Sequence, residues 1–255
     1  MNRTSALARF ALFLVKVQWI DRRATSSFLM GITIQTALLT LGVWKSASAP
    51  GEALAMATRS ALLTCTAIVF LAAMSNVQNE FRYGTVERVL LGKVPFSQLI
   101  GVRAAATAVV SSPAVVVPFL GAAVRFPDLF SATTALLVLQ VYVFLAALCY
   151  QSTLLLCQFR NPGTAVVWLR MAVLFLGLSV VPFPGSATLA LFFPTGWMLK
   201  VAAAAHGTHP ASATAAATAA FVVVTAAWTA ACRLGLGRRT LTAVERNLTD
   251  GTEAV

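Results

Sequence analysis

Six stretches of this sequence are long and apolar enough to cross a membrane, and no other feature limits the possible folds as strongly. A helix needs about 20 apolar residues to cross ~30 Å of hydrocarbon. Hydrophobic residues make up 58% of the chain and charged residues 11%, whereas about 25% of a soluble domain is charged. We therefore expect an all-α membrane protein with one transmembrane domain over residues 1–255. The six transmembrane helices are expected at 24–44 and 54–76 (together 24–76), at 99–124, 129–156 and 164–183 (together 99–183), and at 211–232.

The basic residues are distributed unevenly between the two sides that these helices define. Of the 19 Lys and Arg residues, 14 lie on the side of the N-terminus, whereas Lys45, Arg125 and Lys200 lie on the other side. Loops rich in Lys and Arg remain in the cytoplasm. We therefore expect a multi-pass protein of a bacterial-type plasma membrane, with the N-terminus and the tail over 233–255 both cytoplasmic. No nucleic-acid partner is expected, because the basic residues are scattered among short loops.

The N-terminal segment, residues 1–23, has an apolar side and a basic side. The apolar run over 10–15 is too short for a cleavable signal peptide and is followed by Lys16. We expect an amphipathic interfacial helix on the cytoplasmic face. Its apolar side would consist of Leu7, Phe10, Leu14, Val17 and Ile20, and its basic side of Arg3, Arg9, Lys16, Arg22 and Arg23.

A polar stretch over 77–98 separates the second and third expected spans. It contains charges of both signs, which a loop that only sets orientation does not need. Residues 79–93 predict a short helix with an apolar ridge of Val86, Val89 and Leu90, spaced i, i+3 and i+4. A protein partner would explain the mixed charges. A helix lying on the lipid headgroups is the alternative.

Within this stretch, Glu80-x-Arg82-x-Gly84-Thr85-Val86-Glu87 is followed by Leu90-Leu91 and by Pro95-x-Ser97. This pattern resembles the signature of type-2 ATP-binding cassette (ABC) exporter permeases, in which it implies the coupling helix that contacts the ATPase. The resemblance implies two nucleotide-binding ATPase subunits and a second permease subunit, identical or related. It implies coupling through Glu80, Arg82, Gly84, Thr85, Val86, Glu87, Arg88, Val89, Leu90 and Pro95.

The segment over 184–210 is broken by prolines and glycines into apolar pieces too short to cross a membrane. Such pieces are also too apolar for a solvated loop, so we expect short re-entrant helices before the last span. The run from Phe192 to Lys200 resembles the segment that forms the outer gate of type-2 exporters. The resemblance implies an outer gate built from Pro182, Pro184, Phe192, Phe193, Pro194 and Gly196.

Several other features limit the function. The chain has no G-x-x-x-x-G-K-[ST] motif, so we expect no enzyme activity and no cofactor in this chain, with ATP and Mg bound by the partner subunit. No acidic residue lies in the middle of an expected span, which disfavours an ion-coupled carrier. Arg59 lies near the outer interface, where its side chain can reach the headgroups. Arg170 either lies near the inner interface or is a charge of the transport pathway.

The remaining reactive side chains do not predict a metal site or a disulfide. His206 and His209 have no further ligands nearby. The cysteines, which lie in or at the ends of apolar runs, are predicted to be packing residues. We therefore expect the permease subunit of an ABC exporter that moves a hydrophobic or amphipathic drug, lipid or peptide across the lipid bilayer. A non-transporting membrane scaffold and an ion-coupled carrier are the alternatives.

Overall fold

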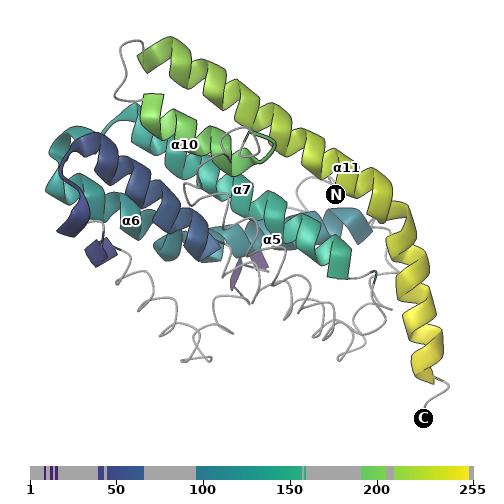
Figure 1. Cartoon of the computed structure of the whole chain (residues 1–255). Coiled ribbons are helices and arrows are strands. Elements are labelled where there is room, and N and C mark those ends of the chain that lie inside the picture. Colours follow the sequence, from purple (N-terminus) through teal and green to yellow (C-terminus); the bar gives the residue numbers. More distant parts are fainter. Residues whose placement is uncertain are drawn as a thin grey trace.

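The described part of the chain consists of helices, with no strand, so the predicted all-α class is confirmed there. The structure is a computed structural model that describes residues 9, 12–13, 15–16, 40–42, 45–65, 96–156, 158, 191–204 and 210–252. Figure 1 shows α7 and α11 running side by side, with α10 between their upper parts. The elements are a helix over 50–65, α5 (Phe96–Val110), α6 (Ser112–Arg125), the 3-10 helix η1 (Pro127–Leu129), α7 (Ala132–Leu156), α10 (Pro194–Ala204) and α11 (Pro210–Thr252).

Two of the described helices are long and apolar enough to cross a membrane. They are α7 and the Ala211–Leu236 part of α11. A third span is possible if the bent pair of helices Ile100–Val110 and Ser112–Arg125 is counted as one. These segments match the expected spans at 129–156, 211–232 and 99–124. The helix over 50–65 covers part of the expected span at 54–76. The span at 164–183 and most of the span at 24–44 lie outside the described residues.

The expected third span is not one straight helix, because α5 and α6 meet at Ser111 with a bend of 41°. Pro113 has no backbone N–H for the carbonyl of Val109, and its ring would clash with that carbonyl in a straight helix. The Ser112 hydroxyl donates to the Val109 carbonyl instead. From the neighbouring helix α7, the Tyr142 hydroxyl donates to the Ser112 carbonyl over 3.4 Å. Proline and two hydroxyl groups therefore account for the bend.

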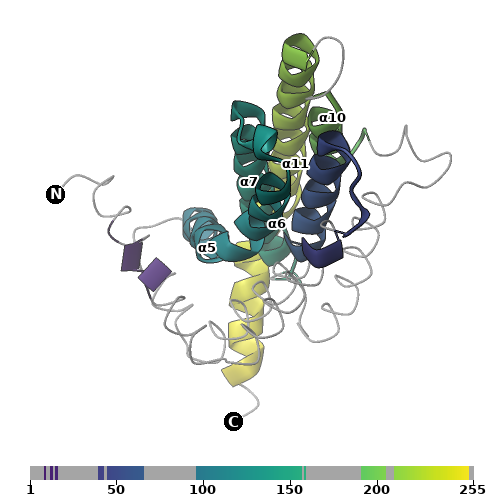
Figure 2. The same cartoon turned by 90° about the vertical axis from the view of Figure 1, so that its left-hand side faces the viewer.

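The last helix is longer than the sequence predicts. α11 continues from Pro210 to Thr252 without a break, so most of the tail expected at 233–255 is a continuation of the same helix. Figures 1 and 2 show that its last turns extend beyond α5, α6 and α7. Similarly, α5 begins at Phe96, so the helix includes residues 96–98, which were expected to belong to the polar stretch over 77–98. In the N-terminal segment, the five described residues between 9 and 16 are helical, as predicted.

Helix starts in this fold follow ordinary capping rules. Pro50 occupies the first position of the helix over 50–65, where a missing N–H costs nothing. The Ser48 hydroxyl and backbone N–H donate to Glu52 at 2.6 and 2.9 Å. These bonds lower the pKa of the exposed Glu52 carboxyl, so this cap is present above the usual carboxyl pKa and is lost as pH falls through the lowered value. At α7, the Ser131 hydroxyl accepts the N–H of Thr134 at 3.3 Å.

One apolar core joins the described helices, and alanine is its most frequent residue. Leu54 and Leu62 from the helix over 50–65 are buried with Phe119 of α6 and Leu145 of α7. Gly121 of α6 lies against Thr40, and a Cβ at this position would overlap the Thr40 methyl group. The prediction that the cysteines are packing residues is confirmed for Cys65 and Cys149, which are buried in this core.

Candidate functional site

The predicted site residues fall into two groups with respect to the structure. The whole proposed coupling set from Glu80 to Pro95 lies outside the described residues, and so do Arg170, Pro182 and Pro184. Their roles remain predictions. Phe192, Phe193, Pro194 and Gly196 of the expected outer gate are described, and they form the turn that enters α10 and the first residues of that helix.

Two tryptophans hold the turn that precedes α10. The Trp197 indole N–H donates to the carbonyl of Leu191 at 2.8 Å, and the Trp228 indole N–H donates to the carbonyl of Phe192 at 2.9 Å. The Phe193 ring stacks on the Trp228 ring with centroids 6.0 Å apart. Carbonyls that precede a helix have no partner within it, and in hydrocarbon an unsatisfied one is costly. The two indoles satisfy consecutive carbonyls of this turn.

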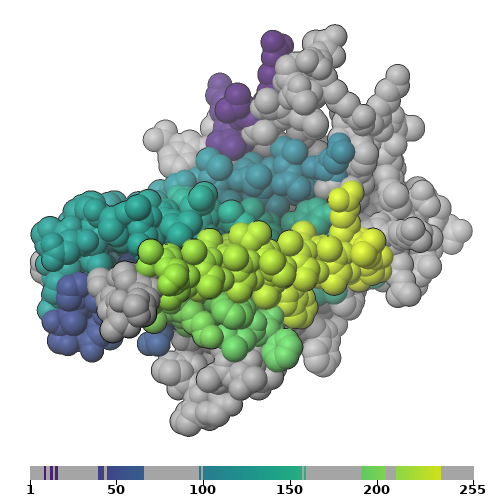
Figure 3. All heavy atoms as spheres, turned by 90° about the horizontal axis from the view of Figure 1, so that it is seen from above, coloured from purple at the N-terminus to yellow at the C-terminus, as the bar shows by residue number. Residues whose placement is uncertain are grey.

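These contacts also fix the direction and depth of α10. Phe193, just before α10 begins, contacts Trp228, and only residues 205–209 separate the end of α10 from the start of α11. The two helices are therefore antiparallel, and Figure 3 shows them side by side on one face. Trp228 lies about 26 Å along the axis from Ala211. At 11 residues, α10 is too short to cross a membrane, yet it begins deep beside the last span.

A row of glutamines connects α7 to α11. The side-chain amide of Gln140 donates to the Thr218 hydroxyl at 3.1 Å, and that of Gln151 donates to the Thr229 hydroxyl at 3.1 Å. At the end of the row, the Gln158 amide donates to the carbonyl of Leu236 at 3.3 Å. Every pair is separated by the same 78 residues. α7 and α11 are therefore parallel and in a fixed register.

The parallel direction limits the path of the chain between these helices. Gln158, beyond the end of α7, contacts Leu236, whereas the same register places Pro210 level with Ala132 at the start of α7. The chain must therefore return along the full length of α7, about 37 Å, between residues 158 and 210. α10 supplies about 16 Å of this return in the required direction.

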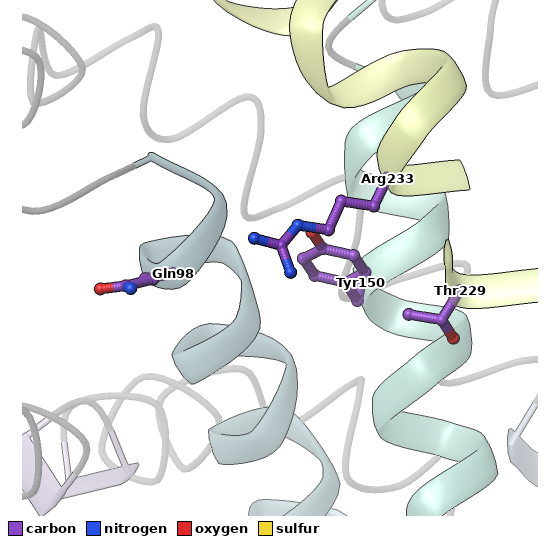
Figure 4. Close-up of a pocket in the computed structure, with 4 residues that line it drawn as sticks. All are labelled: Gln98, Tyr150, Thr229 and Arg233. Carbon is purple, nitrogen blue, oxygen red and sulfur yellow. The ribbon is translucent and has the colours of Figure 1, made fainter. Parts of the chain in front are cut away.

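Near the C-terminal end of α7, beside the middle of α11, lies a cavity of about 320 Å³. Gln98 of α5, Tyr150 of α7, and Thr229 and Arg233 of α11 line it. Figure 4 shows the Arg233 guanidinium reaching from α11 to the hydroxyl end of Tyr150, with α5 opposite. Among the described residues that line the cavity are one permanent cation and no carboxylate. This site can therefore receive an acceptor or an anion.

Sequence reasoning missed the two tryptophans, the glutamine row and the cavity. The glutamines were detectable, because residues 140, 151 and 158 are spaced by three turns and two turns of a helix in an otherwise apolar run. Their partners on α11 were not, since pairing depends on tertiary packing. In the part of the chain that the structure describes, no three His, Cys, Asp or Glu side chains gather as metal ligands do.

No protein-family model, curated protein or solved structure matches this chain.

Proposed function

We propose that this chain is the membrane-spanning permease subunit of an ABC exporter of the type-2 class. The observation that carries the proposal is the residue pattern from Glu80 to Ser97, which lies between two apolar segments and combines an acidic, glycine-containing run with a leucine pair and a proline turn. ATP and Mg would bind to a separate subunit. The cargo would be hydrophobic or amphipathic, such as a drug, a lipid or a peptide.

The parallel register of α7 and α11 supports the six-span topology of this proposal. Two parallel membrane helices need an odd number of crossings between them, and the apolar segment at 164–183 would supply one. That segment would end on the outer side, so the chain must turn inward again before Phe192 contacts Trp228. α10 is then the outward half of a re-entrant pair. In this topology Phe192 and Phe193 would lie at the inner tip of the re-entrant pair, because Trp228, which contacts both residues, is about 26 Å along α11 from Ala211 at its outer end.

The exposure of α11 supports a second subunit. Only 17% of its apolar window is buried inside the chain, against 44% for α7. Val222 and Val223 are 55% and 66% exposed. Such a surface must face lipid or another protein in the membrane. A complete exporter would pair two permease subunits, identical or related, because one bundle of six spans forms only half of a pathway.

Reconstitution tests the function against its alternatives. The chain is incorporated into vesicles with the ATPase subunit that co-purifies with it, and candidate cargo is measured inside and outside. The proposal predicts ATP-dependent movement and cargo-stimulated ATP hydrolysis. A scaffold would give neither result, and an ion-coupled carrier would move cargo with a proton or sodium gradient and no ATP.

Cysteine labelling in intact cells tests the topology separately. In a background without the native cysteines, Ser48→Cys and Thr208→Cys should react with a membrane-impermeant reagent from outside. Arg88→Cys and Glu245→Cys should react only after the membrane is opened. Outside labelling of Arg88→Cys would contradict the proposal, because the coupling stretch would then face away from ATP.

A further inference from the structure

We propose that the cavity between α5, α7 and α11 binds the phosphate of an anionic phospholipid headgroup. This inference rests on the membrane-spanning part of the proposed function and does not depend on ATP coupling. The cavity of about 320 Å³ is lined by Gln98, Tyr150, Thr229 and Arg233. Two observations identify the ligand: the donors that remain available in the cavity, and its position at the ends of two membrane helices.

The available donors favour an anion with several oxygens. Within the described part of the chain, neither the Arg233 guanidinium nor the Tyr150 hydroxyl makes a hydrogen bond or an ion pair, and Figure 4 shows the two groups close together. The Thr229 hydroxyl is already used, because it donates to the carbonyl of Thr225 and accepts the amide of Gln151. A guanidinium presents a planar fork of donors that matches a phosphate, and a neighbouring phenol adds one more.

The position of the cavity matches the headgroup level of a bilayer. Arg233 directly follows the apolar run of α11 that ends at Cys232, and Tyr150 lies about 9 Å along the axis before Leu156, the last residue of α7. Both helix ends are on the same side, since α7 and α11 are parallel. In the proposed topology this is the cytoplasmic side, where anionic lipids attract basic residues.

An apolar track on α7 distinguishes a lipid from a soluble phosphate. Leu139 and Val143 are 58% and 46% exposed. They precede Tyr150 by 11 and 7 residues, which places all three on one face of the helix. From Tyr150 to Leu139 the track is about 16 Å long, close to half of the ~30 Å hydrocarbon thickness. An acyl chain can therefore follow this face while the phosphate lies at Arg233.

Native mass spectrometry of the full-length chain in detergent tests the proposal directly. The chain is titrated with phosphatidylglycerol and, separately, with phosphatidylcholine of the same acyl chains. The first phosphatidylglycerol molecule should bind to the wild-type chain more tightly than the first phosphatidylcholine molecule. Arg233→Gln should weaken phosphatidylglycerol binding about fivefold, the contribution expected of one basic residue at this level. Tyr150→Phe, which keeps the ring, should weaken it about threefold.

Controls separate this site from general charge effects and from free phosphate. Arg246→Gln removes the same charge from the same helix beyond the apolar window and should leave binding within about twofold of the wild type. Millimolar inorganic phosphate should not displace the lipid. Wild-type phosphatidylglycerol binding in Arg233→Gln, or displacement by inorganic phosphate, would overturn the proposal. Should Arg233→Gln fail to fold, Tyr150→Phe provides the decisive comparison. Lipid selectivity is measured without ATPase, so its outcome is independent of coupling.

Discussion

The indole N–H of Trp228 on α11 donates to the backbone carbonyl of Phe192, just before α10, over 2.9 Å. Trp228→Phe keeps an aromatic ring against Phe193 but removes the donor and leaves this carbonyl unsatisfied. We expect a loss of about 0.5–1.5 kcal/mol of stability, the net value of such a bond. Thermal unfolding of the purified chain in detergent measures it. Phe130→Leu, at a ring that is 68% exposed, is the control and should leave the midpoint unchanged. An unchanged midpoint for Trp228→Phe would show that the indole does not hold the turn.

The register of α7 and α11 predicts which positions can be cross-linked. In a chain without native cysteines, Gln140→Cys combined with Thr218→Cys should be joined by a short bifunctional thiol reagent, because the present side chains are in hydrogen-bond contact at 3.1 Å. Gln140→Cys combined with Thr229→Cys should not, because α11 rises about 16 Å between Thr218 and Thr229. Efficient cross-linking of the second pair, or none of the first, would contradict the parallel register.

The contact of Gly121 with Thr40 predicts a strong effect of one methyl group. Gly121→Ala should destabilise the protein by about 1–3 kcal/mol, since the added Cβ would overlap a stiff β-branched side chain in a packed contact. Gly101→Ala is the matched control in α5, where a Cβ would meet nothing within 4 Å. The same unfolding assay compares the two. Adding Thr40→Ala to Gly121→Ala should recover part of the lost stability. Equal unfolding midpoints for Gly121→Ala and Gly101→Ala would show that the contact of Gly121 with Thr40 does not limit stability.

Apolar length predicted the existence and approximate limits of the longest helices. The expected span at 129–156 is α7 from Ala132 to Leu156, and the expected start at 211 differs by one residue from Pro210. The helix continues past residue 232, the expected end of the span, because hydropathy falls after Cys232 whereas helix propensity does not. The bend in the third span was not predicted, and the compensating hydroxyl of Ser112 depends on local geometry that no pattern encodes.

The site was less predictable than the fold. Phe192 and Phe193 were predicted from a resemblance, and the structure places them in a turn held by Trp197 and Trp228. Predicting this turn would have required knowing that α10 folds back against α11. The cavity at Arg233 could not be predicted from the sequence either, because the residues that line it come from three helices far apart in the chain. Residues that act together through tertiary packing leave little trace in local periodicity.

The proposed coupling helix makes a specific prediction about charge. A coupling helix transmits ATP-driven closure only if it is held rigidly by the ATPase subunit, so Val86, Val89 and Leu90 would supply an apolar ridge and the flanking charges would fix the register. Glu87→Lys should place like charges together at that contact and weaken coupling by about 1–3 kcal/mol. A helix lying on anionic lipid would tolerate the change or bind slightly better. Glu245→Lys makes the same charge change in the part of α11 that is expected to be cytoplasmic, and it should be neutral.

The most direct test of the account measures two quantities for Glu87→Lys and Glu245→Lys. They are the amount of ATPase subunit that co-purifies with the chain and the cargo-stimulated rate of ATP hydrolysis in vesicles. The account predicts that Glu87→Lys lowers at least one of them about fivefold or more, as expected for a coupling loss of at least ~1 kcal/mol, while Glu245→Lys matches the wild type. Wild-type values of both quantities in Glu87→Lys would contradict it.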